Sequence, residues 1–353
     1  MTLGRYLLVG LITLGAARAA TAQTSAPAER LPMVGADVSF LRQMEQSGVV
    51  FKDGGTPKPG LQILKDHGYT WVRLRLFNSP DKLPNDLAYT LASAKDAKAL
   101  GFKLLLDFHY ADDWADPAHQ PTPKAWQKLA HSDLTNAVFA YTRDTIRAFR
   151  DAGVMPEMVQ IGNEITSGML WPDGRLPDHW DRFAGLVSAG IQGVDAGRGN
   201  APRPKIMIHI DQGGNRETTQ WFFDNLISRG IKFDIIGQSY YPWWQGSLDD
   251  LRHNLTFMAK TYKKDIVIVE TAYDWETGED FAKKKMPFAE TPAGQREFLQ
   301  ALQKVVVETP DGHGLGIFWW EPMAAGAIAK RALFDREHNA LEAITAFDSH
   351  PAK

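Results

Sequence analysis

Eight apolar runs of strand length recur along the sequence, and helix-like stretches separate most of them. The runs cover residues 33–40, 70–77, 103–110, 158–164, 205–211, 233–241, 265–271 and 315–321. Apolar residues recur every three or four positions between them, at residues 87–100, 134–152, 182–196, 218–229, 248–262 and 295–307. Alternation of this kind predicts a parallel sheet with right-handed crossovers. Eight such units in about 300 residues predict an α/β protein built as a single (β/α)8 TIM barrel.

An open, doubly wound sheet is the main alternative for a chain of alternating strands and helices. Such sheets commonly bind nucleotides through a glycine-rich loop after the first strand. No such loop follows residues 33–40, so we favour the closed barrel and expect no second domain.

The first 32 residues are typical of a targeting segment followed by a linker. Arg5 precedes a short apolar run at residues 6–15, and small residues suited to cleavage end at Ala19 or Ala22. The run is too short for a membrane anchor. We therefore predict a signal peptide at residues 1–22, a linker at 23–32 and a (β/α)8 catalytic domain at 33–350.

Composition limits the compartment and the partners. The chain has no cysteine and a formal net charge of -3, and it contains no block of Lys or Arg. An exported protein without disulfides fits a bacterial periplasm or the culture medium, and the charge pattern excludes nucleic acid as an expected partner. Later residues contain no run long enough to span a bilayer. We expect a monomer that is periplasmic or extracellular and does not bind membranes.

Polar and aromatic residues gather where the predicted strands end. Chemistry in a (β/α)8 barrel takes place at the C-terminal strand ends, so these residues form the candidate site. They are Asp37, Arg73, Arg75, Asp107, His109, Asp112, Trp114, Asn163, Glu164, Trp171, His209, Asp211, Gln238, Ser239, Tyr240, Tyr241, Glu270, Trp319, Trp320 and Glu321.

Two of these strand ends carry a glutamate, Glu164 and Glu270. Strands four and seven lie across such a barrel, so both side chains can converge over its mouth. Two carboxyl groups that flank a glycosidic bond act as general acid and nucleophile when they are about 5–5.5 Å apart, and as acid and base at about 6.5–9.5 Å. The alternative is a structural ion pair of each glutamate with Arg73 or Arg75. Asn163 favours catalysis, because an amide beside an acid can hold a sugar hydroxyl.

The remaining polar residues suggest supporting roles. Arg73 can keep a nearby carboxylate ionised, since an adjacent cation lowers its pKa; a buried structural salt bridge is an equal alternative for Arg75. His109 is expected to contact the ligand. His109, Asp112, Asp116, His119 and Asp211 lack the spacing of metal ligands, so we expect no metal and no required cofactor. For the acidic run at residues 275–280, a solvated loop is favoured over a structural calcium site.

Aromatic residues are abundant, with 11 Trp, 18 Phe and 9 Tyr. Flat aromatic faces next to polar strand ends can stack against sugar rings. The candidates in loops and strand tips are Trp114, Trp171, Trp243, Trp244 and Trp320. Of these, Trp320 is expected to form the floor beneath the sugar at the cleavage point.

Taken in order, the strand-end segments resemble the endo-β-1,4-galactanases (arabinogalactan endo-β-1,4-galactanases) of glycoside hydrolase family 53, a family of the large retaining (β/α)8 clan. The resembling segments span nearly the whole mature chain. They are residues 35–39, 72–75, 107–117, 160–164, 170–172, 205–211, 239–242, 269–271 and 320–322. The segments at 107–117 and 205–211 are the most specific, whereas Asn163-Glu164 is shared across the clan.

The resemblance implies retaining endo-hydrolysis of β-1,4-galactosidic bonds in galactan or type I arabinogalactan, the side chains of pectin. It implies that Glu164 is the acid/base and Glu270 the nucleophile of a double displacement. Central sugar contacts are implied for Arg73, His109, Asn163, Tyr240 and Trp320.

Several loops depart from the family pattern, which leaves product length open. They lie at residues 77–78, 111, 212–215 and 273–275. Some bacterial relatives hold calcium after strand seven, but this shortened loop does not match well enough to carry that site over.

Two other functions compete with this prediction. A mannanase or cellulase of the same clan would share both glutamates but not the segment at 107–117. A periplasmic sugar-binding protein without turnover would not need a pair of carboxylates.

Overall fold

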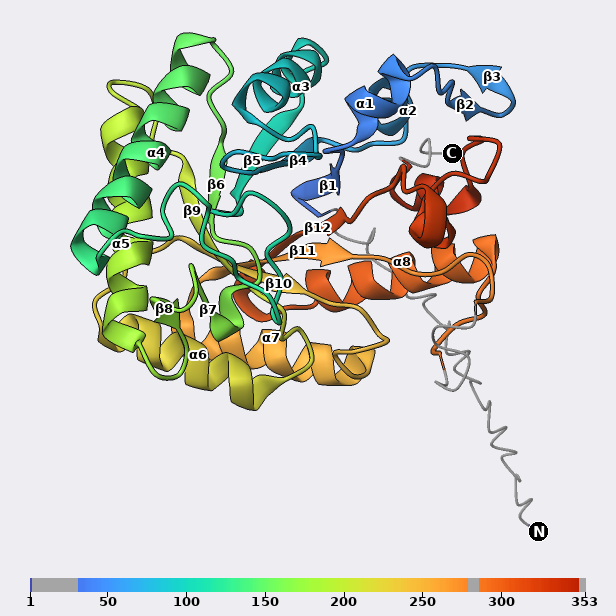
Figure 1. Cartoon of the computed structure of the whole chain (residues 1–353). Coiled ribbons are helices and arrows are strands. Elements are labelled where there is room, and N and C mark those ends of the chain that lie inside the picture. Colours follow the sequence, from blue (N-terminus) through green and yellow to red (C-terminus); the bar gives the residue numbers. More distant parts are fainter. Residues whose placement is uncertain (2–30, 279–285, 349–353) are drawn as a thin grey trace. The chain divides into compact units, whose positions relative to one another are not determined.

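A closed barrel of eight parallel strands forms the centre of the computed structural model, which describes residues 1, 31–278 and 286–348 (Figure 1). The strands follow one another around the barrel in the order β1, β12, β11, β10, β9, β6, β5 and β4, and β4 closes onto β1. They are β1 (Met33–Asp37), β4 (Trp71–Leu76), β5 (Lys103–Phe108), β6 (Met158–Ile161), β9 (Lys205–Ile210), β10 (Ile235–Ser239), β11 (Asp265–Thr271) and β12 (Gly314–Trp319). The predicted TIM barrel and its eight strands are confirmed.

Helices connect successive barrel strands and pack around them (Figure 1). They are α1 (Leu41–Gln46), α2 (Gly60–Asp66), α3 (Leu87–Ala99), α4 (His131–Asp151), α5 (Trp180–Gly197), α6 (Arg216–Ser228), α7 (Leu248–Tyr262) and α8 (Pro292–Val307). Local capping explains several starts: the Asp86 carboxylate accepts from the Tyr89 N–H before α3, and Ser247 forms a capping box with Asp250 before α7. All six predicted helices are present, with ends that differ by up to three residues.

Several short elements were not predicted from the sequence. Besides α1 and α2, they are the hairpins β2 (Lys52–Asp53) with β3 (Thr56–Pro57) and β7 (Gly168–Met169) with β8 (Gly174–Arg175). Four 3-10 helices also occur, namely η1 (Ile165–Ser167), η2 (Pro310–Gly312), η3 (Gly326–Arg331) and η4 (Glu342–Phe347). In the described part of the chain, β12 is followed by η3 and η4 and not by an α-helix.

Apolar side chains fill the lower part of the barrel interior. The group consists of Trp71, Leu105, Met158, Met207, Ile235, Val267, Val269 and Phe318, all at most 4% exposed. Glycines make room for two of them: a Cβ on Gly35 would lie 2.4 Å from the Phe318 ring, and one on Gly237 would lie 2.7 Å from the Met207 sulfur. The interior is therefore a packed core, and polar side chains are confined to the layer above it.

The targeting prediction concerns residues that the structure does not describe. Apart from Met1, the structure does not describe the predicted signal peptide at 1–22 or the linker up to Arg30. Residues 349–353 also lie outside the described residues. Leu31, at the end of the predicted linker, is 7% exposed and belongs to the core. Over residues 31–278 and 286–348, no helix combines the length and the apolar character that crossing a bilayer requires.

Candidate active site

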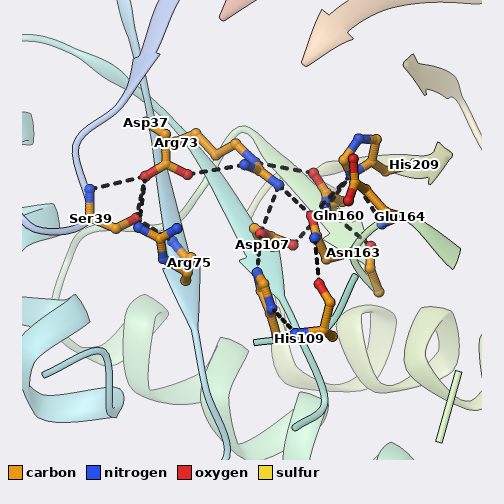
Figure 2. Close-up of polar contacts among 12 residues, drawn as sticks. Asp37, Ser39, Arg73, Arg75, Asp107, His109, Gln160, Asn163, Glu164 and His209 are labelled. Atoms are coloured by element: carbon orange, nitrogen blue, oxygen red, sulfur yellow. Dashed lines mark hydrogen bonds and ion pairs between the residues drawn. The ribbon is translucent and has the colours of Figure 1, made fainter. Parts of the chain in front are cut away.

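Directly above the apolar layer, the guanidinium of Arg73 binds side chains from four barrel strands and from the segment after β6. Figure 2 shows its contacts with Asp37, Asp107, Gln160 and Asn163. It contacts the carboxylates of Asp37 on β1 (3.0 Å), Asp107 on β5 (2.8 Å) and Glu270 on β11 (2.7 Å). It also donates to the Asn163 carbonyl oxygen (2.8 Å) and to Gln160 on β6 (3.3 Å). We call Arg73, Asp37, Asp107 and Glu270 the arginine cluster. One cation contacts three buried carboxylates and links the ends of their strands.

Glu270 reaches this layer because β11 is irregular. Val267 and Val269 both face the barrel interior, so regular alternation would turn Glu270 outward. The register with β12 shifts between Ile268 and Thr271, and the register with β10 shifts so that Glu270 pairs with Ser239. Such a β-bulge re-aims a side chain. Here it brings Glu270 to the mouth of the barrel.

Glu164 follows β6 in a left-handed backbone conformation, with φ 47° and ψ 51°. Its Oε1 accepts a hydrogen bond from the Ser239 hydroxyl (2.6 Å), and the Ser239 oxygen lies 2.8 Å from Nε2 of His209. The backbone N–H of Glu164 donates to Nδ1 of His209 (3.3 Å), so Nε2 of this ring carries the proton that is directed at Ser239. Burial and the nearby Arg73 hold the pKa of His209 well below its usual range. A neutral histidine thus orients Ser239, and Ser239 orients Glu164.

Glu164 and Glu270 differ in the charged and polar groups around them. Burial, Glu270 and Asp211 raise the pKa of Glu164 well above its usual range, and its polar partner is a hydroxyl. Burial also raises the pKa of Glu270, but the Arg73 guanidinium opposes the shift. Although burial acts in the other direction, Arg73 and His109 lower the pKa of Asp107 to about 2. Of the pair, Glu164 therefore retains a proton more readily, and Glu270 is the carboxyl group stabilised as an anion.

Both glutamates line one cavity of about 540 Å³ at the barrel mouth. Nine residues of the predicted strand-end set lie on its wall, namely Arg75, His109, Trp114, Asn163, Glu164, Asp211, Tyr241, Glu270 and Trp320. They come from seven different strands or the segments that follow them, β4, β5, β6, β9, β10, β11 and β12. The structure thus brings most of the predicted site together in one place.

Several predicted site residues are not part of this wall. Asp37 and Arg73 lie beneath it in the arginine cluster. Asp112 organises a loop by accepting from the N–H groups of Ser79 and Lys124. The Trp171 indole donates to the Ser167 carbonyl oxygen and stacks under Arg175, and the fully buried Tyr240 ring stacks on Phe298.

Four residues after β10 and β12 complete the cavity, and two of them, Gln245 and Arg331, were not predicted from the sequence. The Tyr241 hydroxyl donates to Oε2 of Glu270 (3.1 Å), and Tyr241, Trp244, Gln245 and Arg331 line the wall. Tyr241 belongs to the predicted strand-end residues, and Trp244 belongs to the predicted stacking residues. The sequence did not decide which of two adjacent aromatics faces the cavity, because β10 ends at Ser239 and alternation does not extend beyond the strand.

Trp114 is held in place by cationic and aromatic neighbours. The Arg75 guanidinium lies 4.3 Å from its ring centroid, and the Trp320 centroid lies 6.4 Å away. Arg75 also pairs with Glu321. In the same loop, the Ala115 N–H donates to His109 and the Ala115 carbonyl accepts from Asn163. Trp114 and Trp320 together form a rigid aromatic wall of the size that a sugar ring covers.

Metal binding receives no support from the described residues. Over residues 31–278 and 286–348, no three His, Asp or Glu side chains are grouped as ligands for an ion. In the acidic run that was weighed as a calcium site, Glu276 pairs with Arg336 (3.1 Å), and residues 279–280 lie outside the described part of the chain. The absence of a required cofactor stays a prediction.

Comparison with known proteins gives a consistent result. Residues 33–347 match the model of glycosyl hydrolase family 53. The arabinogalactan endo-β-1,4-galactanase of Humicola insolens is 36% identical over 336 residues, which cover 89% of this chain and 98% of that protein.

Solved structures agree with the sequence relatives. A fungal β-1,4-galactanase superposes with a TM-score of 0.83 at 34% identity, covering 90% of this chain and 99% of that one. The catalytic domain of an Ignisphaera aggregans protein of the same family gives a TM-score of 0.83 at 33% identity, covering 92% and 97%.

Proposed function

Since the chain belongs to glycosyl hydrolase family 53 and is therefore a glycosidase, we propose that it hydrolyses internal β-1,4-galactosidic bonds of galactan and type I arabinogalactan with retention of configuration. The observation that carries the proposal is that Glu164 and Glu270 line the same cavity, with a hydroxyl bound to Glu164 and a guanidinium bound to Glu270. We infer the substrate from a relative that is named an arabinogalactan endo-β-1,4-galactanase.

In the first step, Glu270 attacks the anomeric carbon while Glu164 protonates the departing glycosidic oxygen. The new bond joins Oε1 or Oε2 of Glu270 to the sugar, and the bond between the anomeric carbon and the leaving oxygen breaks. Because Ser239 donates to Oε1 of Glu164, Oε2 is the oxygen that carries the transferred proton. Arg73 keeps Glu270 ionised for the attack.

In the second step, Glu164 removes a proton from a water molecule, which attacks the anomeric carbon of the galactosyl-enzyme. The carbon–oxygen bond to Glu270 breaks, and Glu270 leaves as a carboxylate beside Arg73. Glu164 regains its proton, so the enzyme returns to its starting state. Two inversions at one carbon give net retention.

A polymer panel tests the substrate. Purified protein is incubated with potato galactan, mannan and carboxymethylcellulose, and new reducing ends are measured. We expect release from galactan with little from the other two polymers. Release from mannan or cellulose alone would identify another activity of the clan, and release from none would favour a sugar-binding protein.

Variants test the two roles. Glu270→Ala removes the nucleophile, so turnover should fall by roughly 10⁴–10⁶-fold. Glu164→Ala removes the acid/base, which contributes about 10²–10⁴-fold. Glu276→Ala is the matched control, because Glu276 pairs with Arg336 at the surface and should leave the rate unchanged.

Added azide separates the two assignments. In Glu164→Ala, azide should attack the galactosyl-enzyme and give a β-galactosyl azide. In Glu270→Ala, azide should attack the substrate from the vacated Glu270 side and give an α-galactosyl azide. The opposite stereochemistry would exchange the two roles.

A further inference from the structure

We propose that Asp211 is a positioning residue for the acid/base Glu164, which it holds in place through the hydroxyl group of Thr166. The inference rests on the proposed galactan hydrolysis. Asp211 directly follows β9 and lines the catalytic cavity together with Glu164. It also lines a second cavity of about 400 Å³, so a hydrogen bond to a sugar hydroxyl is the alternative role for this carboxylate.

The segment that carries Glu164 is short and irregular. Glu164 has a left-handed backbone conformation, and the 3-10 helix η1 that follows it is three residues long. The Glu164 side chain does not cap η1, so the first turn of this helix gains no support from the residue before it. The direction of the Glu164 carboxyl group therefore depends on contacts from other parts of the chain.

Asp211 supplies such a contact through two hydrogen bonds with Thr166, which lies two residues after Glu164. The Thr166 hydroxyl donates to Oδ1 of Asp211 (2.5 Å), and the Asp211 backbone N–H donates to the Thr166 hydroxyl oxygen (3.3 Å). A hydroxyl group that binds a carboxylate at the first of these distances forms one of the stronger hydrogen bonds in proteins. The pair thus fixes η1 against the end of β9.

Residues on either side of this contact are held by the loop after β5. The Gln120 side chain donates to the Asn163 carbonyl oxygen (2.8 Å), and the Ser167 hydroxyl donates to a carbonyl oxygen of that loop (2.6 Å). Both contacts remain when the bond between Thr166 and Asp211 is removed. Its loss should therefore loosen the direction of Glu164 without unfolding the segment.

The Asp211 carboxylate also acts on Glu164 through its charge. After burial and Glu270, it is the next group that raises the pKa of Glu164. Asparagine at position 211 can still accept from Thr166 but carries no charge, so it should lower the pKa of Glu164. The other groups that face Glu164 would stay in place, namely Ser239, Arg73, His209, Tyr241 and Glu270.

The surroundings of Asp211 connect its charge to the contact with Thr166. Burial raises the pKa of Asp211, and Asp116 acts in the same direction. Hydrogen bonds from Thr166 and Gln212 oppose this shift, because they stabilise the ionised carboxylate. The Thr166 hydroxyl therefore favours the charged form of the residue that holds it.

Aryl β-1,4-galactobiosides whose phenols differ in acidity test the position of Glu164. Their leaving groups are single rings, so they occupy the same place in the enzyme but need the acid to different degrees. In Thr166→Val, which cannot donate to Asp211, kcat/KM should fall roughly 10–100-fold for the phenyl glycoside. It should stay within about twofold for the 2,4-dinitrophenyl glycoside, whose leaving group departs without a proton. Thr166→Ser keeps the hydroxyl and should restore the wild-type dependence on the phenol.

Asp211→Asn tests the charge. The alkaline limb of the pH profile of kcat/KM for the phenyl glycoside reports the pKa of the acid in the free enzyme. Because the loss of a negative neighbour lowers the pKa of Glu164, this limb should move to lower pH by about one unit. A lost sugar contact would leave the limb in place.

Thr135→Val is the matched control, because the Thr135 hydroxyl donates to the His131 carbonyl oxygen within α4 and lines neither cavity. Melting temperatures report the folding of each variant. Equal losses on all glycosides in Thr166→Val, or an alkaline limb that does not move in Asp211→Asn, would overturn the positioning role. A wild-type protein that cleaves no galactoside would instead overturn the proposed function.

Discussion

Arg73 is the residue on which the charge balance of the site depends. Its guanidinium faces three carboxylates at 3.0 Å or less in a layer closed to solvent. Removing one partner from a buried ion-pair cluster typically costs about 3–5 kcal/mol, because the remaining charges lose their compensation. Among the described residues no cation contacts the Glu164 carboxylate, and its raised pKa is a cost in stability that we attribute to function.

Glu164→Gln should therefore stabilise the protein at neutral pH. The raised pKa of Glu164 means that its contribution to stability is full below the unfolded value of about 4.3 and is lost as the pH rises through the folded value. Glutamine is neutral at every pH and can still accept from Ser239. We expect the melting temperature to rise by roughly 2–4 °C at pH 7.5, with no difference near pH 4.

Scanning calorimetry at both pH values measures this effect. Glu276→Gln serves as the control, because this surface glutamate pairs with Arg336 and should show no pH-dependent gain. A Glu164→Gln variant that melts below the wild type at pH 7.5 would show that the carboxylate stabilises the fold.

At the scale of elements, the site depends on irregular strand ends. The bulge in β11 turns Glu270 inward, and the chain leaves β6 through Gly162 and Glu164, with φ values of 82° and 47°. Gly162 is also crowded, since a Cβ there would lie 2.6 Å from Cγ2 of Ile165. Glycine at this position lets the strand end turn sharply enough to place Glu164.

Gly162→Ala should reduce kcat by roughly 10–100-fold, because a displacement of about 1 Å is enough to misplace a catalytic group. Gly153→Ala is the control: Gly153 also has a positive φ, 72°, but nothing lies within 4 Å of its Cβ position. Both variants should lose about 1–2 kcal/mol of stability from backbone strain. Steady-state kinetics and urea unfolding distinguish strain from misplacement, and equal activity of the two variants would contradict the role of Gly162.

At the scale of the whole molecule, the question is where the protein acts. The chain has no cysteine, so its folding does not depend on the redox state of a compartment. We propose export through residues 1–22, followed by action on polysaccharide outside the cytoplasm.

Expression of the full chain in a bacterial host should yield a mature protein that begins at Gln23, because small residues at positions 20 and 22 suit cleavage. Mass spectrometry of the periplasmic fraction and the medium measures the mature mass. Replacing Ala20 and Ala22 by phenylalanine should block processing. Recovery of uncleaved wild-type protein in the cytoplasm would refute export.

Sequence patterns by themselves determined the barrel and the edge that carries the site. Strand alternation with helical spacing has few folded solutions, and polar residues at strand ends are too costly to bury without partners. The sequence therefore pointed to Glu164 and Glu270 as a pair, while their roles in the prediction came from family resemblance.

Only the tertiary structure decided which neighbouring side chains face the cavity. The hydroxyl of Tyr241 and not that of Tyr240 contacts the Glu270 carboxylate, Arg73 lies beneath the cavity wall, and Trp244 borders a second cavity. The physical reason is that the two-residue period of a strand stops where its hydrogen bonds stop. Beyond that point, a side chain's direction depends on bulges, glycine conformations and contacts from distant parts of the chain, which local sequence does not encode.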